Sequence, residues 1–344
     1  MRAGARARLE QRLTQAWTTR GPLACALWPL SQIYGALAAL RRALYRTRVL
    51  QAERLPLPVV VVGNVVAGGA GKTPTTLAVA LHLRTRGWQP GIVSRGHGRR
   101  TTDVRGVAPD ADPRDVGDEP LLLRRRAQVP VAVGARRAAA GRALLAAHPE
   151  VDVLVCDDGL QHLALARDVE IAVFDARGIG NGWLLPAGPL REPWPRPVDL
   201  MLATEVPAPG TFGPAEPAFS ATRQLAEHAL RADGSTVPLR TLQATPLTAV
   251  AGIARPQAFF DLLRQAGLAL ADTVALPDHY DFNSWSRTTG AEQTLICTEK
   301  DAMKLWRHRP DALAVPLQLQ VPAAFFAALD ERLAARGYHP RQRA

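Results

Sequence analysis

Short runs of β-branched and apolar residues alternate with longer Ala- and Leu-rich stretches from position 55 onward. This alternation is typical of parallel strands joined by helices that cover the sheet. Strands are predicted at 58–64, 90–94, 129–134, 152–157, 170–175 and 199–204, and helices at 74–86, 118–127 and 136–147. The pattern therefore predicts an α/β fold with a parallel sheet flanked by helices.

A Pro- and Gly-rich segment at 205–220, EVPAPGTFGPAEPAFS, interrupts the alternation and is typical of a linker. Beyond it, strand-like runs PLTAVAGI, DTVALP, TLICT and PLQLQV alternate with helices predicted at 256–267, 299–306 and 322–336. We therefore predict a core at 55–210 and a second, smaller α/β lobe at 211–344. The last helix could pack on the second lobe or back on the first.

Residues 1–54 differ from the rest of the chain, because they hold ten arginines against two glutamates and so carry a net charge of +8. Between Arg20 and Arg41 lies GPLACALWPLSQIYGALAAL, which contains no charged residue. As a helix this stretch would be about 30 Å long, just enough to cross a bilayer. Pro29 and two polar residues near its middle weaken that interpretation.

Aromatic residues accompany the arginines on both flanks of this apolar stretch, at Trp17, Trp28, Tyr34 and Tyr45. This combination favours a segment that lies in or dips into an anionic membrane surface. A cleaved signal peptide and a buried helical hairpin are the alternatives. We expect 1–54 to associate with a membrane.

Composition limits the class of protein. The chain has 344 residues, of which 47% are hydrophobic and 21% charged, values that indicate a globular rather than a disordered protein. Its three cysteines exclude a fully paired disulfide framework and offer no cysteine-rich metal cluster. The net charge is +11, but the chain lacks the interleaved aromatic and basic residues that are typical of a nucleic-acid recognition module. We expect no nucleic-acid partner and infer no obligate protein partner.

The strongest single motif is a glycine-rich loop that follows a run of four valines and precedes a predicted helix. Such loops bind phosphate through backbone N–H groups and the helix N-terminus, with the lysine on the terminal phosphates and the hydroxyl on Mg²⁺. We predict that the loop binds ATP. Its residues are Val66, Ala67, Gly68, Gly69, Ala70, Gly71, Lys72 and Thr73.

The loop is a variant of the standard pattern G-x-x-x-x-G-K-[ST], because Val66 occupies the position of the first glycine. A related variant in membrane-targeting and partitioning ATPases carries a second lysine directly before the Gly-Gly pair, where this chain has Ala67. The absence of that lysine counts against this class of ATPase.

The stretch VCDDGLQH at 155–162 follows an apolar strand and ends in a dense group of polar side chains. An aspartate at the end of a strand beside a phosphate loop commonly positions Mg²⁺. We predict a Mg²⁺ site made by Thr73, Asp157 or Asp158, and Gln161. A purely structural role of Asp158 in the turn is the alternative.

Several motifs in order along the chain resemble the tetraacyldisaccharide 4'-kinase family, which phosphorylates a precursor of lipid A. They are VGNVVAGGAGKTP (62–74), SRGHGR (94–99), GDEP (117–120), DDGLQH (157–162), LPAGPLREP (185–193), PDHYDF (277–282) and TEKDAMK (298–304). DDGLQH together with the variant loop is highly specific, whereas GDEP or TEKD alone would be weak.

The resemblance implies a peripheral or monotopic enzyme on the cytoplasmic face of the bacterial inner membrane. Such an enzyme transfers the γ-phosphoryl group of ATP to the 4'-hydroxyl of an acylated glucosamine disaccharide 1-phosphate. It also implies that the second lobe closes over the nucleotide. A membrane-associated P-loop ATPase that switches a binding surface is the alternative function.

The family pattern implies a base formed by Asp118 of GDEP with His279 of PDHYDF, and these two residues with Lys72 and Asp158 form the predicted catalytic set. A histidine titrates near neutral pH, which suits removal of a proton from a sugar hydroxyl. From local sequence alone, Asp118 equally begins a helix, and His279 could be a solvated loop residue.

Arg191 lies in a proline-bounded loop and is predicted to clamp a phosphate of the nucleotide, a surface arginine being the alternative. His97 stands where the family pattern has tyrosine, and its role is undefined, as are those of Arg95, His162 and Lys300. The T-x-x-D pattern at 298–301 favours a helix capping box.

Overall fold

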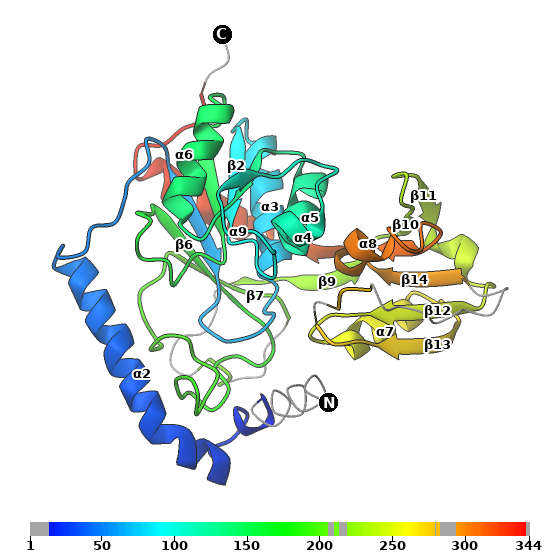
Figure 1. Ribbon diagram of the computed structural model, residues 1–344, viewed down its shortest axis with the longest axis horizontal. Coiled ribbons are helices and arrows are strands. Elements are labelled where there is room, and N and C mark those ends of the chain that lie inside the picture. Colours follow the sequence, from blue (N-terminus) through cyan, green and yellow to red (C-terminus); the bar gives the residue numbers. More distant parts are fainter. Residues whose placement is uncertain (1–13, 206–209, 213–218, 279, 283–293, 342–344) are drawn as a thin grey trace.

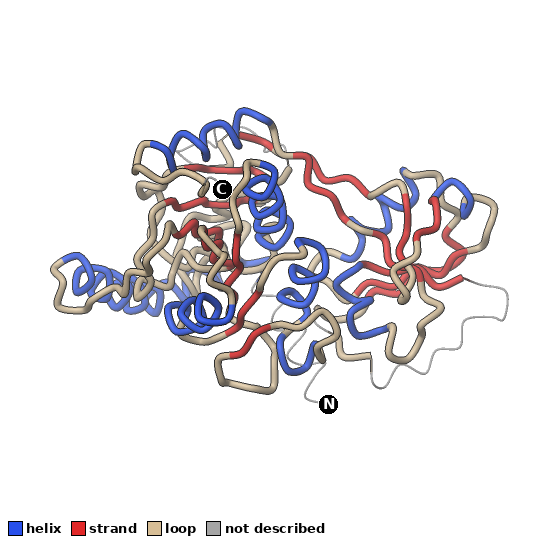
Figure 2. The backbone as a smooth tube through the Cα atoms, turned by 90° about the horizontal axis from the view of Figure 1, so that it is seen from above, coloured by secondary structure: helices blue, strands red, loops and turns tan. Residues whose placement is uncertain are grey.

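The computed structural model describes residues 14–205, 210–212, 219–278, 280–282 and 294–341. They form two lobes, each built on its own sheet, with a long N-terminal helix on the outside of the first lobe (Figure 1). Seen from above, the two sheets lie side by side along the long axis of the molecule (Figure 2).

The first lobe contains an eight-stranded sheet in the order β3-β4-β2-β5-β1-β6-β7-β8. Among its described strands β3 runs antiparallel to β4, and the other neighbouring pairs are parallel. The strands are β1 (Val59–Gly63), β2 (Pro90–Ser94), β3 (Arg105–Gly106), β4 (Val131–Val133), β5 (Val153–Asp157), β6 (Val169–Phe174), β7 (Leu200–Ala203) and β8 (Phe219–Ser220).

Helices cover both faces of this sheet, so its central strands β1 and β5 are buried at every position. Val60 and Val62 of β1 share one core with the helices α3 (Lys72–Thr85), α5 (Asp118–Ala127) and α9 (Ala323–Ala334), whereas Val59 and Val61 share another with α6 (Arg137–Ala147). The helices of the first lobe are α3 (Lys72–Thr85), α4 (Pro113–Val116), α5 (Asp118–Ala127) and α6 (Arg137–Ala147).

The second lobe contains a six-stranded sheet in the order β11-β10-β15-β14-β12-β13. Its strands are β10 (His228–Leu230), β11 (Thr236–Pro238), β12 (Leu247–Ala251), β13 (Leu270–Ala275), β14 (Thr294–Thr298) and β15 (Leu313–Val315). Its helices are α7 (Pro256–Gln265), α8 (Glu299–Leu305) and the short 3₁₀ helix η1 (Leu239–Leu242). The predicted α/β class with a second, smaller lobe is confirmed.

The chain passes between the lobes more often than the predicted division at residue 210 implies. β8 belongs to the first sheet, and β9 (Thr222–Leu225) pairs with β16 (Leu317–Gln320) in a separate antiparallel ribbon that joins the lobes (Figure 1). The final helix α9 (Ala323–Ala334) then packs on β6 and β7 of the first sheet. Of the two positions left open for this helix, the first lobe is the one that it occupies.

The apolar N-terminal stretch forms one helix, α2 (Pro22–Arg46), with Pro29 inside it. It is the helix among the described residues that is long and apolar enough to cross a membrane, by length and composition. A buried helical hairpin, one of the three interpretations above, is wrong for 22–46, because several large apolar side chains of α2 are 44–62% exposed.

Candidate active site

The phosphate loop joins β1 to α3 at the carboxyl edge of the first sheet. Gly71 caps the helix with a φ of 87°, and Gly68 has a φ of 97°, a region that favours glycine. Within the described part of the chain, the N–H groups of Gly68, Gly69, Ala70 and Gly71 donate no hydrogen bond. Four unpaired donors at a helix N-terminus form a binding place for an anion.

Asp157 ends β5, next to the phosphate loop, and is only 2% exposed. Its carboxylate accepts hydrogen bonds from the hydroxyl of Thr76 on α3 at 3.0 Å and from that of Ser94 at the end of β2 at 3.1 Å. Burial, together with the nearby carboxylates of Glu119 and Asp158, raises the pKa of Asp157 to about 7. Each oxygen of this carboxylate thus accepts a hydrogen bond that fixes it within the lobe.

Thr76 and Ser94 were not among the predicted site residues. Ser94 carried a usable signal, because it is the last residue of a predicted strand, and the carboxyl ends of neighbouring parallel strands meet at one edge. Thr76 carried none, since a threonine within a helix is not distinctive in sequence.

Asp158 is the accessible carboxylate of the pair. It has a φ of 49°, which turns the chain sharply after β5, and its side chain is 36% exposed. Arg191 Nη1 lies 3.1 Å from Asp158 Oδ1, and Lys72 Nζ lies 3.9 Å from the same oxygen. The structure thus brings three predicted site residues together around one carboxylate.

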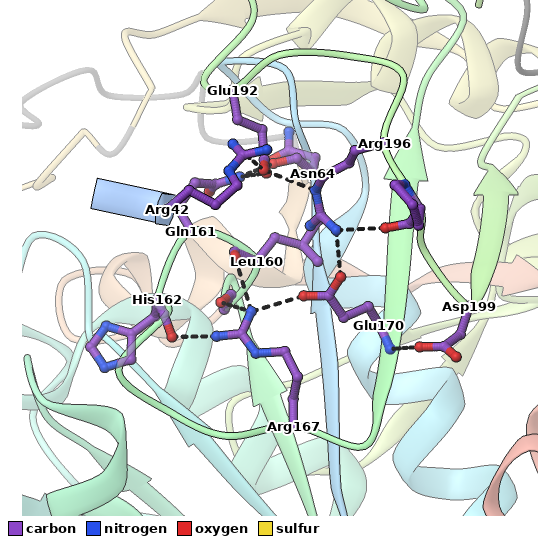
Figure 3. A network of polar contacts seen from close by, with 12 residues as sticks. Arg42, Asn64, Leu160, Gln161, His162, Arg167, Glu170, Glu192, Arg196 and Asp199 are labelled. Carbon is purple, nitrogen blue, oxygen red and sulfur yellow. Dashed lines mark hydrogen bonds and ion pairs between the residues drawn. The ribbon is translucent and has the colours of Figure 1, made fainter. Parts of the chain in front are cut away.

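Gln161 and Glu192 extend this group toward the N-terminal helix. Gln161 Nε2 donates to the backbone oxygen of Asn64 at 3.0 Å and to Glu192 Oε1 at 2.7 Å, which leaves the amide oxygen of Gln161 as its possible metal ligand. Glu192 also accepts from Arg42 of α2 at 3.2 Å and from Arg196 at 2.9 Å (Figure 3).

The same network continues beneath the DDGLQH turn. Arg196 contacts Glu170, which binds Arg167 at 2.9 Å, and Arg167 donates to the backbone oxygens of Leu160 and His162 (Figure 3). Charged hydrogen bonds that are half-buried in this way hold a turn firmly. The network fixes the backbone on which Asp157, Asp158 and Gln161 stand.

His162 belongs to the scaffold of the turn. Its Nε2 lies 3.3 Å from the backbone N of Arg137, at the start of α6. Burial, followed by the charges of Arg137, Arg167, Arg41 and Arg95, lowers the pKa of His162 to about 4. The ring is therefore neutral near pH 7 and accepts this hydrogen bond.

Asp118 begins α5 after Gly117, so the prediction of a helix start at this position is confirmed. The side chain is 5% exposed, and its Oδ2 lies 2.6 Å from Lys304 Nζ of α8 in the second lobe. The next residue, Glu119, lies 3.5 Å from Lys300 Nζ, which also lies 3.1 Å from Asp278. His279 lies outside the described residues.

Lys304 and Lys300 reach Asp118 and Glu119 because α8 begins with a strong cap. The hydroxyl of Thr298 accepts from the backbone N of Asp301 at 3.2 Å, and Asp301 Oδ2 accepts from the backbone N of Gly252 at 3.0 Å. Thr298 thus caps α8 as predicted, but the box at 298–301 is not complete, because the Asp301 carboxylate accepts from the hydroxyl of Thr298 at 2.6 Å and from Gly252 instead of from the backbone N–H of Thr298.

The donor set around Asp158 suits Mg²⁺, although no group of three or more His, Cys, Asp or Glu side chains that could hold a metal is found among the described residues. Mg²⁺ is commonly held by one or two carboxylates together with substrate phosphates and water. Asp158 supplies an accessible carboxylate, and Thr73 stands in the first turn of α3 beside Lys72. These residues fit the ion without a dedicated protein cage.

One face of α2 is docked on the loop that carries Arg191. Ser31, 1% exposed, donates to the backbone oxygen of Leu184 at 2.7 Å, and Tyr34 donates to that of Arg191 at 2.6 Å. On another face, five exposed apolar residues lie within about 100° of arc at the helical repeat. This stripe comprises Leu23, Leu30, Ile33, Leu37 and Leu40.

Known proteins match this chain over nearly its whole length. A family model described as LpxK, Tetraacyldisaccharide-1-P 4'-kinase, matches residues 23–334. A tetraacyldisaccharide 4'-kinase of Acidovorax sp. (strain JS42) is 61% identical over 327 residues, covering 95% of this chain and 96% of that protein. One of Delftia acidovorans (strain DSM 14801 / SPH-1) is 56% identical over 325 residues, covering 94% and 95%.

Among solved structures, the chain is similar to one described as the "apo" form of LpxK from Aquifex aeolicus in complex with ATP. The two are 27% identical with a TM-score of 0.77, and the match covers 92% of this chain and 100% of that one. The sequence matches and this structural match agree with the site geometry, and the chain belongs to the tetraacyldisaccharide 4'-kinase family.

Proposed function

We propose that this protein transfers the γ-phosphoryl group of ATP to the 4'-hydroxyl of a tetraacyldisaccharide 1-phosphate, a step of lipid A biosynthesis. The observation that carries the proposal is the set of four unpaired loop N–H groups beside Lys72 and Asp158, in a chain of this family. Relatives that bear the name of this kinase and a related structure in complex with ATP support it.

The reaction exchanges one P–O bond for another. The bond between the γ-phosphorus and the β,γ-bridging oxygen breaks, and its electron pair leaves with ADP. A bond forms between the γ-phosphorus and the 4'-oxygen, and the hydroxyl proton passes to a base. Such a transfer depends on positioning and on neutralising charge on the phosphoryl oxygens. Lys72 and the loop N–H groups have the charge and the direction for this task.

Mg²⁺ would be held by Asp158 and Thr73, with Asp157 and Gln161 behind them. Asp158 is the better direct ligand because Asp157 is buried and already accepts two hydroxyl hydrogen bonds. When bound, the ion neutralises charge on the phosphate oxygens. Arg191 lies 3.1 Å from Asp158, so its guanidinium can pair with a nucleotide phosphate that is bound beside this carboxylate.

Asp118 with His279 is the proposed base. Lys304 fixes the position of the Asp118 carboxylate, which suits an aspartate that orients a histidine. The hydroxyl proton then resides on the imidazole of His279, and the aspartate keeps the ring in place.

The apolar stripe of α2 is proposed to lie in the cytoplasmic face of the inner membrane. An acylated disaccharide is costly to extract from a bilayer, so an enzyme that acts on it gains by docking there. Because α2 also contacts the Arg191 loop, docking would bring Arg191 and Glu192 close to the lipid surface.

Transfer of labelled γ-phosphate to a tetraacyldisaccharide 1-phosphate in detergent micelles tests the activity. We expect a Mg²⁺-dependent bisphosphorylated lipid and little ATP hydrolysis without the acceptor. If empty vesicles stimulate ATP hydrolysis and no lipid product appears, the protein is a membrane-associated switch ATPase instead.

Sedimentation with anionic phospholipid vesicles tests the membrane contact. Replacing Ile33 and Leu37 by Ser should reduce the bound fraction several-fold, because each loses about 1.5–3 kcal/mol of apolar burial. Leu81→Ser is the matched control, since Leu81 is also an exposed leucine on a helix but lies on α3. Equal binding of all three proteins would remove α2 from the membrane contact.

A further inference from the structure

Arg177 holds two carbonyl groups of the phosphate loop from outside. Its Nη1 lies 3.5 Å from the oxygen of Ala67, and its Nη2 lies 3.4 Å from that of Gly69. These are long hydrogen bonds, but a guanidinium also orients carbonyl dipoles through its charge. A β-carbon added to Gly68 would stand 3.1 Å from Arg177 Nη1, so the loop passes directly beneath this side chain.

Arg177 itself is anchored by Asp175, which follows β6, the strand beside β1. Asp175 is 2% exposed, and its Oδ2 lies 2.9 Å from Arg177 Nε and 2.8 Å from Nη2. This two-point ion pair leaves the outer edge of the guanidinium for the loop. The position of the arginine is thus set by the first sheet.

Asn64 holds the intervening carbonyl groups of the loop. Its Nδ2 donates to the oxygen of Val66 at 2.6 Å and to that of Gly68 at 3.1 Å. Asn64 is fully buried, and its Oδ1 has no partner in the part of the chain that the structure describes. A buried oxygen without a partner costs stability, and the two hydrogen bonds of the amide nitrogen offset that cost.

Planar trans peptides make these contacts relevant to the anion. In such a peptide the C=O of one residue and the N–H of the next point in opposite directions. The N–H groups of Gly68 and Ala70 therefore point away from Arg177, and that of Gly69 points away from Asn64. These three are among the donors that remain unpaired at the loop.

We propose that Arg177 and Asn64 are positioning residues of the phosphate loop, which fix its peptide planes so that the N–H groups face the nucleotide phosphates. This inference rests on the proposed nucleotide site. It gives this variant loop two supports of its own. The loop has Val66 where the standard pattern has its first glycine, and Ala67 where the partitioning ATPases have their second lysine.

Calorimetric binding of ATP and ADP with Mg²⁺ to Arg177→Met tests the proposal. We expect the Kd of both nucleotides to rise by about tenfold, because two hydrogen bonds that orient the loop are lost. The melting temperature should also fall, because the buried Asp175 carboxylate loses its partner, so binding is measured well below it. Arg105→Met is the matched control, since Arg105 is also 35% exposed and pairs with the aspartate two positions earlier, but lies on β3. It should bind both nucleotides as the wild type does.

Further variants separate positioning from charge. Arg177→Lys should bind both nucleotides nearly as weakly as Arg177→Met, because one ammonium cannot reach two carbonyls from the same anchor. The double variant Asp175→Asn with Arg177→Met removes both charges and should stay weak. Wild-type binding by the double variant would assign the effect to the unpaired charge of Asp175 and overturn the proposal.

Comparison of the two nucleotides decides the remaining alternative. If Arg177→Met loses affinity for ATP but not for ADP, the guanidinium contacts the terminal phosphate directly and does not position the loop.

Two further variants test the other residues. If Asn64→Ala has the melting temperature and the nucleotide affinity of the wild type, Asn64 does not position the loop. Lys72→Ala tests the site itself: if it binds both nucleotides normally, the proposed nucleotide site fails. If only Lys72→Ala is impaired, the positioning role fails alone.

Discussion

The phosphate side of the site and the base side are built in different ways. Around the phosphate loop, the carboxylates and hydroxyl that fix the site come from one lobe: Ser94, Asp157 and Asp175 stand at the carboxyl ends of β2, β5 and β6 of one sheet. At the proposed base, Asp118 of the first lobe meets Lys304 of the second. The phosphate side is therefore assembled within one rigid sheet, whereas the base side depends on how the two lobes meet.

The ion pairs on either side of Asp118 strengthen this contrast. Arg126 binds Glu299 at 2.6 Å and Arg307 binds Asp112 at 2.9 Å, and each of these pairs joins α8 or the residues after it to the first lobe.

The chain has three lysines among its 42 lysine and arginine residues. Lys72 lies on the phosphate side of the site, and Lys300 and Lys304 lie beside Glu119 and Asp118. At these positions a compact, flexible ammonium can make contacts that the planar guanidinium of arginine cannot.

The largest effect is expected on the phosphate side, from Lys72→Ala. Loss of the cation that reaches the terminal phosphates should lower kcat/KM for lipid phosphorylation on the order of 10³-fold. Lys72→Arg should recover little of this, because a planar guanidinium does not fit the place of an ammonium. Full activity of either variant in the micelle assay would show that this lysine does not contact the phosphates.

Asp118→Asn should come next, with a fall in kcat on the order of 10²-fold and little change in ATP affinity. The reason is that Asp118 is proposed to act on the acceptor proton through His279 and not to hold ATP. Single-turnover kinetics and ATP binding measured on the same protein check both parts. If Asp118→Asn loses ATP affinity instead, Asp118 also contributes to nucleotide binding, and the two sides of the site are not separate.

Lys304→Met should reduce kcat by about tenfold, because Asp118 loses a buried charged hydrogen bond from the other lobe. Arg307→Met is the control: it also removes an ion pair between the lobes, but its partner Asp112 is not the base. Equal losses in both variants would mean that contact between the lobes matters and the Asp118 contact does not.

The smallest effect concerns stability on the phosphate side. Because the folded pKa of Asp157 is raised to about 7, the native state holds this proton more tightly than the unfolded chain does. Its contribution to the free energy of unfolding is present at low pH and is lost as the pH rises toward 7. The slope is at most about 1.4 kcal/mol per pH unit.

Urea unfolding without divalent ions, from about pH 5 to pH 8, measures this slope. Asp157→Asn cannot titrate, so the stability of the wild type relative to this variant should fall over that range. A constant difference between the two proteins would show that Asp157 is ionised throughout and that Ser94 and Thr76 hold its charged form.

The sequence by itself determined six strands of the first sheet, the phosphate loop and the cap of α8, because these follow from local spacing and chemistry. The runs at 59–62 and 153–156 are apolar on both strand faces, and the glycines before Lys72 permit the backbone that an anion needs. The cap at Thr298 is likewise a contact between neighbours in sequence. Each of these features requires knowledge of only a few adjacent residues.

Only the tertiary structure decided which residues meet across the chain. Lys304 and Asp118, Arg177 and the loop carbonyls, and α9 and the first sheet are distant in sequence, and many side chains of the same types compete for such contacts. Short strands at 222–225 and 228–230 were not predicted, since isolated runs of this length are stabilised by pairing with partners elsewhere. Pairing, register and the meeting of the lobes depend on the whole fold, so no local pattern contains them.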